Sequence, residues 1–242
     1  SGKTTLVQSI LYSLCKNYSS AEVQFYVLDY SSRMLKMFDS MPHCGAVLTE
    51  ENEDSLNDFF DLLNEIVATR KKQFSEWETD SFETAHAVHQ LPLILVLIDG
   101  LAGLGTSKSG EAHIYKLQKY IRDGVNYGVK YIISCSHLNE ASVRIRQEFG
   151  DRLCFHMREK FDYSDALNCK VSYVPPDKPG RGLYKWDDEP LEFHAAMYCP
   201  DLGDRERSKR LKEQLQDFRE RSGNATGAMR LPVYRQDASY EE

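Results

Sequence analysis

Short runs of β-branched and aromatic residues alternate along this chain with longer stretches whose apolar residues recur at helical spacing. Such alternation is typical of α/β folds. The run from Leu93 to Ile98 is apolar at every position, which indicates a strand buried on both faces, as in a parallel sheet between helices. We therefore expect a mostly parallel central sheet flanked by helices on both faces. The expected strands are Val23 to Leu28, Ala46 to Leu48, Leu93 to Ile98, Tyr131 to Cys135, Leu153 to His156, Gly182 to Lys185 and Leu191 to Ala196.

Four longer segments predict helices. The segments from Thr5 to Lys16 and from about Glu53 to Trp77 place apolar residues three and four positions apart, which predicts amphipathic helices that connect parallel strands. Two more run from about Ala112 to Val125 and from about Asp204 to Arg221. The last is dense in charges of both signs, so we interpret it as a solvated helix face rather than a nucleic-acid patch.

Composition indicates one sizeable domain with an appendage, because 242 residues include 41% hydrophobic and 28% charged positions. We expect a main module over residues 1–203, a C-terminal helix over 204–221 and a linker over 222–242, where small, polar and acidic residues gather. The net charge of −7 disfavours DNA as a partner unless a local basic patch exists.

Cysteines and apolar runs suggest the compartment. The six cysteines show no CxxC or Cys/His ligand spacing, which is typical of reduced, intracellular thiols. The longest apolar run, Leu91 to Ile98, is far shorter than the roughly 20 residues that span a bilayer, and no signal peptide opens the chain. We expect this segment to be soluble.

The chain opens with a phosphate-binding signature. Ser1-Gly2-Lys3-Thr4-Thr5 leads directly into an amphipathic helix and matches the second half of G-x-x-x-x-G-K-[ST]. In that loop, backbone N–H groups and the positive helix end hold phosphates, the lysine reaches the terminal phosphates and the hydroxyl binds Mg²⁺. We expect Gly2, Lys3, Thr4 and Thr5 to bind ATP. The first glycine of the loop, and the strand that feeds it, are expected upstream of Ser1.

A second signature strengthens the first. Asp99 follows the apolar run and stands at the carboxyl end of a central strand, where a magnesium-bound water needs a carboxylate. Thr4 and Asp99 are therefore the expected Mg²⁺ residues. The alternative is that Asp99-Gly100 only forms a turn after a buried strand. Together the two signatures predict a RecA-like P-loop NTPase fold.

The residue after Asp99 bears on turnover. ATPases that activate a water commonly place a glutamate there, whereas this chain has Gly100. Losing one general base typically costs about 10² to 10⁴ in rate, so we expect slow or no hydrolysis. Asp29, at the end of the first strand, is a weak substitute, and a capping carboxylate needs no catalytic role.

A polar pair ends the fourth expected strand. Ser136 and His137 follow Cys135 at the position where P-loop ATPases often keep a residue that senses the γ-phosphate. We expect Ser136 to help bind nucleotide, with a plain strand-end turn as the alternative.

Taken together, these motifs resemble the FtsK/SpoIIIE-type ATPases and, within them, the tandem modules of the EssC/EccC coupling ATPases of type VII secretion. Gly2-Lys3-Thr4-Thr5 stands at the Walker A position, and Leu95-Val-Leu-Ile-Asp-Gly100 resembles the degenerate Walker B of the second and third modules. Further likenesses lie at Tyr26-Val-Leu-Asp-Tyr30, Arg144-Ile-Arg-Gln-Glu-Phe-Gly-Asp-Arg152 and Pro179-Gly-Arg-Gly-Leu183. Without the resemblance, the Pro-Gly-Arg-Gly run is only a tight turn; with it, Arg181 gains interest.

The resemblance implies a cytoplasmic domain of a bacterial membrane-anchored secretion motor. It implies adjacent ATPase modules in the same chain, a homo-hexamer, and small helical secreted substrates of the WXG100 type. Residues 222–242 resemble the connector into a following module. The binding of ATP and Mg²⁺, rather than fast hydrolysis, would then regulate neighbouring modules or engage substrate.

Two other functions stay open. One is a DNA-translocating motor, in which a ring neighbour supplies an arginine such as Arg144 or Arg146. The acidic composition and Gly100 weigh against it, and the chain lacks the winged-helix domain of DNA-pumping members. The other is a scaffold module that has lost nucleotide altogether, which Gly100 would also suit.

Overall fold

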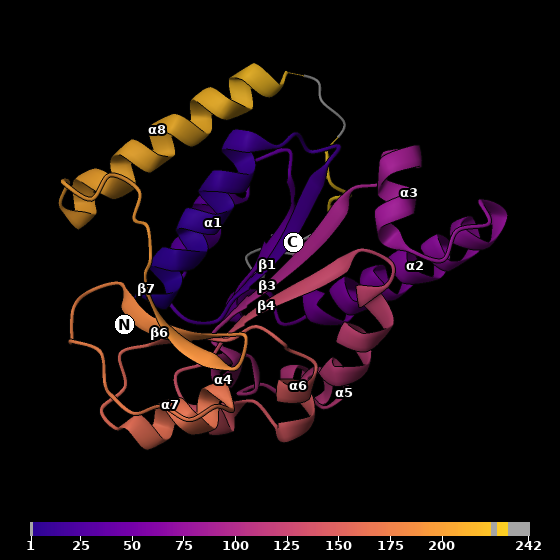
Figure 1. Cartoon of the computed structure of the whole chain (residues 1–242). Coiled ribbons are helices and arrows are strands. Elements are labelled where there is room, and N and C mark those ends of the chain that lie inside the picture. The colour runs from indigo at the N-terminus through magenta and orange to yellow at the C-terminus, as the bar shows by residue number, and fades with distance from the viewer. Residues whose placement is uncertain (1, 224–226, 232–242) are drawn as a thin grey trace, which may run out of the picture.

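The main sheet of the computed structural model has four parallel strands in the order β2-β1-β3-β4 (Figure 1). The structure describes residues 2–223 and 227–231; the expected linker's residues 224–226 and 232–242 lie outside this range. The expected strands are confirmed, with ends shifted by one or two residues. They are β1 (Val23–Asp29), β2 (Cys44–Leu48), β3 (Leu93–Asp99) and β4 (Val129–Ser134).

The last three expected strands form a separate antiparallel sheet in the order β5-β6-β7. They are β5 (Leu153–Phe155), β6 (Arg181–Trp186) and β7 (Glu189–His194). Asp187 and Asp188 connect β6 to β7 with φ of 50° and 62°, the left-handed backbone that a two-residue hairpin turn requires. The parallel character expected of the sheet therefore holds for β1 to β4 only.

Four long helices match the expected ones: α1 (Lys3–Asn17), α2 (Ser55–Glu76), α5 (Lys108–Val125) and α8 (Asp204–Ser222). Among the described residues, no helix is both long and apolar enough to cross a membrane. Shorter helices, which offer too few periodic positions to be recognised from sequence, are α3 (Phe82–His89), α4 (Leu101–Leu104), α6 (Val143–Gln147), α7 (Lys160–Leu167) and the 3₁₀ turns η1 (Met34–Phe38), η2 (Glu50–Asn52) and η3 (Leu138–Glu140).

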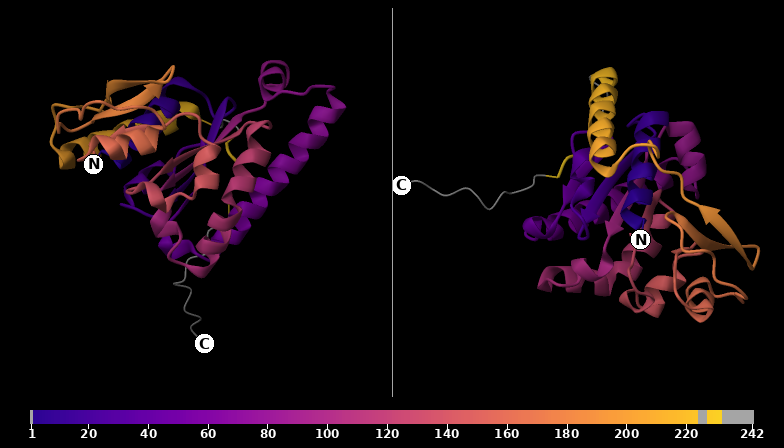
Figure 2. Two further views of the ribbon diagram at one scale, coloured as in Figure 1. Left: turned by 60° about the horizontal axis from the view of Figure 1, so that its bottom comes forward. Right: turned by 90° about the vertical axis from the view of Figure 1, so that its left-hand side faces the viewer.

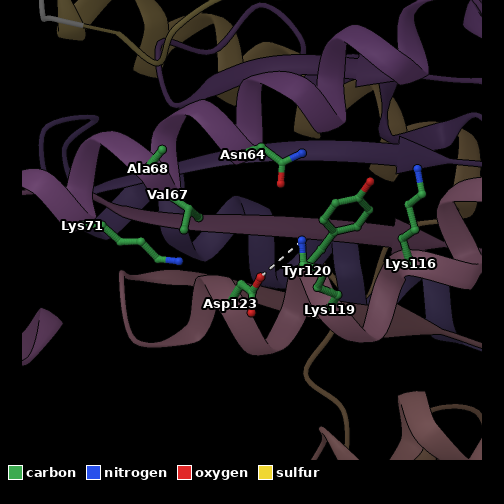
Figure 3. Close-up of a pocket in the computed structure, with 8 residues that line it drawn as sticks. All are labelled: Asn64, Val67, Ala68, Lys71, Lys116, Lys119, Tyr120 and Asp123. Atoms are coloured by element: carbon green, nitrogen blue, oxygen red, sulfur yellow. Dashed lines mark ion pairs between the residues drawn. The ribbon is translucent and has the colours of Figure 1, made fainter.

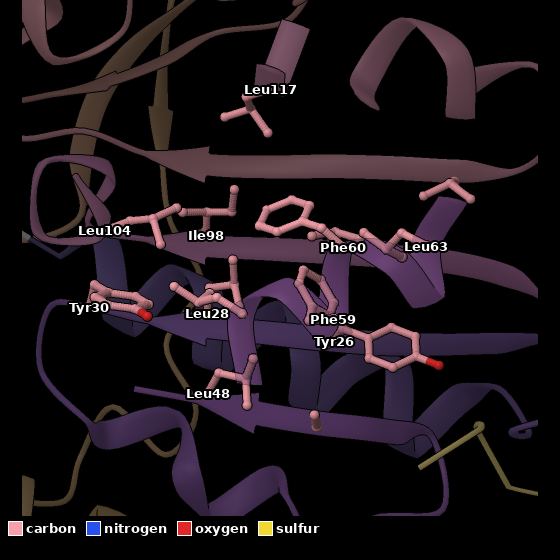
Figure 4. Close-up of a cluster of buried hydrophobic side chains, with 14 of the residues drawn as sticks. Tyr26, Leu28, Tyr30, Leu48, Phe59, Phe60, Leu63, Ile98, Leu104 and Leu117 are labelled. Atoms are coloured by element: carbon pink, nitrogen blue, oxygen red, sulfur yellow. The ribbon is translucent and has the colours of Figure 1, made fainter. Parts of the chain in front are cut away.

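Helices cover both faces of the main sheet. Successive residues of a strand point to opposite faces, and in this sheet the residues on both faces are buried. Tyr26 and Leu28 of β1 lie on one face, where they pack with Phe59 and Phe60 of α2 (Figure 4). The intervening residues Phe25 and Val27 lie on the other face, with Val7 and Leu11 of α1. The prediction of a doubly covered parallel sheet is confirmed.

The charged helix α8 packs along α1 rather than on the sheet itself (Figures 1 and 2). Its Leu211 and Leu215 are buried, and the Tyr12 hydroxyl of α1 donates a 2.6 Å hydrogen bond to Gln214. Most of its charged residues are exposed, as the mixed charge pattern predicts.

Residues 227–231, which we call the strap, are packed against the edge of the sheet, although composition predicts a linker there. The N–H groups of Ala228 and Leu231 donate to carbonyls of Pro42 and Gly45 at 2.8 and 3.1 Å. The Tyr26 hydroxyl donates to the Met229 carbonyl at 2.9 Å. Leu231 joins the main core cluster. The strap therefore covers the outer edge of β2.

Leu231→Ala should lower the free energy of unfolding by roughly 2 to 3 kcal/mol, because it empties a buried site against the sheet. Met229→Ala is the matched control from the same strap, since the Met229 side chain is 60% exposed, and should change stability by less than about 0.5 kcal/mol. Urea unfolding of both variants measures the difference. Equal, small losses would show that the strap is not docked in solution.

Candidate nucleotide site

The amino end of α1 is built to receive an anion. Gly2 precedes the helix with φ of 85°, a conformation that glycine adopts without strain. An added Cβ would lie 3.5 Å from the Phe155 ring, so conformation rather than lack of space favours glycine here. The first intrahelical bond runs from Leu6 N–H to the Gly2 carbonyl, at 2.9 Å. The N–H groups of Lys3, Thr4 and Thr5 precede it and point out of the helix end, where the helix dipole is positive.

Asp99 meets this helix end from the carboxyl end of β3. The Thr4 hydroxyl donates a 2.7 Å hydrogen bond to Asp99 Oδ2, although the two residues are 95 positions apart. The Ser134 hydroxyl donates to Asp99 Oδ1 and accepts the N–H of Gly100 at 3.0 Å. Asp99 is only 1% exposed, so these two hydroxyls serve a carboxylate that water barely reaches. The structure thus brings Thr4 and Asp99 together and adds Ser134 to them.

Ser134, which sequence reasoning missed, is the last residue of β4. It pairs in register with Asp99, the last residue of β3. The apolar pattern extends to Cys135, one residue past the end of β4, so it does not mark Ser134 as the residue beside Asp99. Ser134 could have been found by noting that parallel strands end at the same edge of a sheet, so that the last polar residue of β4 lies beside Asp99.

Ser136 and His137 lie just beyond that edge. Both are exposed, and their N–H groups donate to the Glu140 carboxylate at 2.9 and 3.1 Å. Ser136 and Lys3 both line a groove beside β4. The N–H groups of Ser136 and His137 thus make the contacts of a strand-end turn. This turn lies beside the end of α1 that bears Lys3.

The thiol of Cys135, the residue before Ser136, is not an activated nucleophile. Burial raises the pKa of Cys135 to about 11; the charge of Glu140 adds to the rise, and the charge of Lys3 opposes it. The thiol is therefore neutral at pH 7.

Asp29 lies beside Asp99 in the sheet register and is fully buried. Its carboxylate accepts backbone N–H groups from Leu35 at 2.9 Å, Ser32 at 3.2 Å and Ser31 at 3.4 Å. These bonds hold the turn that follows β1. The geometry supports the capping role of Asp29 over a catalytic one.

Gly100 is more than a missing carboxylate. It has φ of 90° and precedes α4, and an added Cβ would lie 2.9 Å from the Tyr30 carbonyl oxygen and 3.1 Å from Ser31 Cβ. A Cβ added at the next glycine, Gly103, would lie 2.3 Å from the same carbonyl oxygen. A side chain at either glycine would therefore require the neighbouring Tyr30 backbone to move.

The arginines singled out from sequence lie outside the cluster of Thr4, Asp99 and Ser134. Arg144 is exposed and Arg146 half-buried, both on α6. The Arg146 carbonyl accepts a 2.7 Å bond from Arg152. Arg181 opens β6 and pairs with Glu192 at 3.3 Å, which ties the two strands of the hairpin together.

A divalent cation would find oxygen ligands here. No three His, Cys, Asp or Glu side chains gather into a metal site within residues 2–223 and 227–231. The hydroxyl of Thr4 and the carboxylate of Asp99, 2.7 Å apart, are the hard oxygen donors that Mg²⁺ prefers. With so few protein ligands, they fit a Mg²⁺ ion that keeps waters and phosphate oxygens as its remaining ligands.

A second groove lies between α2 and α5 and has a volume of about 530 Å³ (Figure 3). Three lysines surround it, and Lys119 pairs with Asp123 at 3.9 Å. None of its lining residues belongs to the cluster of Thr4, Asp99 and Ser134. The lining residues are Asn64, Val67, Ala68, Lys71, Lys116, Lys119, Tyr120 and Asp123.

Comparison with known proteins agrees with this geometry. The model of the FtsK/SpoIIIE family matches residues 1–168. The chain is 26% identical over 208 residues to the ESX-4 secretion system protein EccC4 of Mycobacterium tuberculosis. That match covers 83% of this chain but only 16% of the relative, so the chain spans about a sixth of the length of this curated relative.

Solved structures share the fold. EssC (ATPases 2 and 3) from Geobacillus thermodenitrificans aligns with 96% of this chain and 44% of its own, at 20% identity and a TM-score of 0.84. Thermomonospora curvata EccC (ATPases 2 and 3), in complex with a signal sequence peptide, aligns with 96% of this chain and 42% of its own, at 22% identity and a TM-score of 0.82. The central sheet and its helices are thus those of a P-loop ATPase domain.

Gly100→Ala should lower the free energy of unfolding by roughly 1 to 3 kcal/mol, because a left-handed residue acquires a Cβ against the Tyr30 carbonyl. Gly150→Ala is the control, since Gly150 has no atom within 4 Å of an added Cβ and no positive φ. Its stability should change by less than about 0.5 kcal/mol. Thermal or urea unfolding compares the two; a Gly100→Ala protein as stable as the parent would contradict the backbone geometry.

Proposed function

Because the chain belongs to the FtsK/SpoIIIE family, we propose that it is an ATP-binding module of a type VII secretion ATPase, acting through nucleotide binding more than through fast hydrolysis. The observation that carries the proposal is the contact between Thr4 and Asp99. It unites the two halves of a nucleotide site, the helix end that binds phosphates and the strand-end carboxylate that binds Mg²⁺.

Each residue then has a distinct task. The N–H groups at the start of α1 hold phosphate oxygens, and Lys3 balances the charge of the terminal phosphates. Thr4 and Asp99 hold Mg²⁺, which when bound neutralises charge on the phosphates. Ser134, bonded to Asp99, keeps that carboxylate oriented. Ser136 stays a candidate for sensing the terminal phosphate from the groove that it shares with Lys3.

Slow hydrolysis is part of the proposal. The position after Asp99 offers no side chain that could orient or deprotonate a water, which costs about 10² to 10⁴ in rate. A side chain at Gly100 would also be strained, because the residue has a positive φ and an added Cβ would lie 2.9 Å from the Tyr30 carbonyl oxygen. Asp29 is engaged by three backbone N–H groups and is a poor replacement.

Bound nucleotide would then act by shifting the module between states, which requires a difference in affinity between those states. We infer adjacent modules in the same protein, because the chain aligns with less than half of a structure that holds two ATPases. We further propose that it is a second or third module, a cytoplasmic domain of a membrane-anchored motor that assembles as a homo-hexamer.

The proposed substrates are small helical secreted proteins of the WXG100 type. Support comes from the Thermomonospora curvata relative, whose ATPases 2 and 3 were solved with a signal sequence peptide. The module would either bind such substrates or regulate the neighbours that do.

Translocation of DNA is the less favoured function. The net charge of −7 opposes binding to phosphate backbones, and the charges of α8 are of mixed sign. It would also require Arg144 or Arg146 to reach the site of a neighbouring subunit. If the module were a scaffold that binds no nucleotide, the contact between Thr4 and Asp99 would have only a structural role.

Lys3→Ala should weaken ATP binding by roughly 10- to 100-fold, because one charge-assisted contact to phosphate contributes about 1.5 to 3 kcal/mol. Lys16→Ala, at the exposed far end of the same helix, is the control and should leave affinity unchanged. Calorimetric titration with Mg-ATP, in the full-length protein, measures both.

Equal affinity of the Lys3→Ala and parent proteins would sink the proposal and favour the scaffold. Hydrolysis that DNA stimulates, with salt-sensitive DNA binding, would favour the translocating motor instead. Tight ATP binding without appreciable turnover is the expected result.

A further inference from the structure

The groove between α2 and α5 shares no residue with the proposed nucleotide site. Its volume is about 530 Å³, and its lining residues all belong to these two helices (Figure 3). On each helix they follow the spacing i, i+3, i+4, i+7, so each set is one stripe about two turns long. The α2 stripe is Asn64, Val67, Ala68 and Lys71, and the α5 stripe is Lys116, Lys119, Tyr120 and Asp123.

The two helices run side by side in the same direction. Asn57 of α2 lies 2.9 Å from the ring of His113 on α5, 56 positions further along the chain. Two turns of α2 separate Asn57 from the Lys71 end of the groove, where the Lys71 ammonium lies 5.4 Å from the centre of the Tyr127 ring, again 56 positions further along. A constant offset means that the helices are parallel and in register, as in a parallel coiled coil. The two stripes therefore form the two sides of one lengthwise groove.

The apolar side chains of the groove are Val67, Ala68 and the ring of Tyr120. The Tyr120 ring is half-buried and stacks on the core residue Phe60, with 4.8 Å between ring centroids. Ala68 is exposed, and its short side chain lets another backbone approach closely. A groove between two helices, with small and apolar residues along it, is the surface into which the side-chain ridge of a third helix packs.

Positive charge surrounds these apolar residues. Lys71, Lys116 and Lys119 line the groove and are exposed, while Asp123 is its one acidic lining residue. Lys119 pairs with Asp123 at 3.9 Å, so the lining residues keep an excess of positive charge. The chain as a whole has a net charge of −7. The groove therefore attracts acidic groups that the rest of the chain repels.

Two classes of anionic partner can be compared with these features. Nucleic acid is held mainly through its phosphates, which need basic residues but no apolar contacts. An amphipathic helix with acidic flanks uses both features, because its apolar face covers apolar side chains while its carboxylates meet lysines. The apolar residues between the lysines, and Asp123 among them, favour the helix.

We propose that the α2–α5 groove binds an acidic amphipathic helix of a partner protein, packed as a third helix against these two. Apolar side chains at every third or fourth position of that helix would lie on Val67, Ala68 and Tyr120. Its carboxylates would pair with Lys71 and Lys116. The proposal goes beyond the proposed function and holds whether or not the module binds ATP.

Titration with a synthetic peptide tests the proposal. The probe is a peptide of about 18 residues, long enough to form a helix in water, with Leu at every third or fourth position and Glu on both flanks. Its twin has Lys in place of each Glu. Fluorescence anisotropy with the full-length protein should show saturable binding of the acidic peptide, at least about tenfold tighter than that of its twin. Equal affinities, or no saturable binding of the acidic peptide, would overturn the proposal.

Charge reversal on α2 locates the binding. Lys71→Glu should weaken binding of the acidic peptide by about tenfold or more, because an attraction becomes a repulsion. Lys72→Glu is the matched control, since Lys72 is the next residue of the same helix, has a side chain that is 80% exposed and does not line the groove. Its affinity should stay within about twofold of the parent. Equal losses in the two variants would show that overall charge governs binding, which also contradicts the proposal.

Ala68→Arg separates docking in the groove from attraction to its surface. The change adds a positive charge but fills the space beside Val67 and Tyr120, and arginine suits a helix nearly as well as alanine. A helix that lies in the groove should bind at least about tenfold more weakly, whereas binding that is only electrostatic would become stronger and refute the docking. Circular dichroism melts check that each variant is folded. Duplex DNA that binds the parent but not Lys71→Glu, without peptide binding, would assign the groove to nucleic acid instead.

Discussion

The hydrogen bond from the Thr4 hydroxyl to the Asp99 carboxylate joins the first helix to the end of a central strand. A carboxylate this deeply buried is costly unless donors satisfy it, and a second hydroxyl, from Ser134, completes the set. Ser134 in turn accepts the N–H of Gly100. Three elements are thereby held at one edge of the sheet: α1, β3 and β4. The orientation of the α1 amino end, and with it the proposed phosphate site, depends on this chain of bonds.

The sequence predicted the framework well because long apolar patterns carry it. The run from Leu93 to Ile98 and the spacing in α2 leave little choice of structure. The strap was not predictable in this way: five residues of mixed polarity, 227–231, dock through backbone bonds to β2, and backbone bonding has no compositional signature. At the site, Thr4 and Asp99 follow from motifs. Ser134 was missed because the apolar pattern does not mark where β4 ends.

Gly100 illustrates a second limit of sequence reasoning. The sequence shows only that Gly100 has no carboxylate, and it suggests that a glutamate substituted there would restore a general base. Its positive φ and the nearness of the Tyr30 carbonyl are properties of the fold, and they mean that a side chain must first displace backbone. A Gly100→Glu protein would therefore report strain and chemistry together. The absence of a base is built into the path of the chain between β3 and α4.

The groove along β4 connects this architecture to nucleotide affinity. The α1 helix is anchored at its amino end by Thr4, but Leu6, Val7 and Ile10 present one of its flanks to the groove. Packing against that flank would also restrict the helix end whose N–H groups are proposed to bind phosphates. Binding that requires an ordered helix end is weakened by the fraction of molecules in which it is not ordered. Packing along this flank of α1 and the proposed phosphate site are thus coupled through the helix.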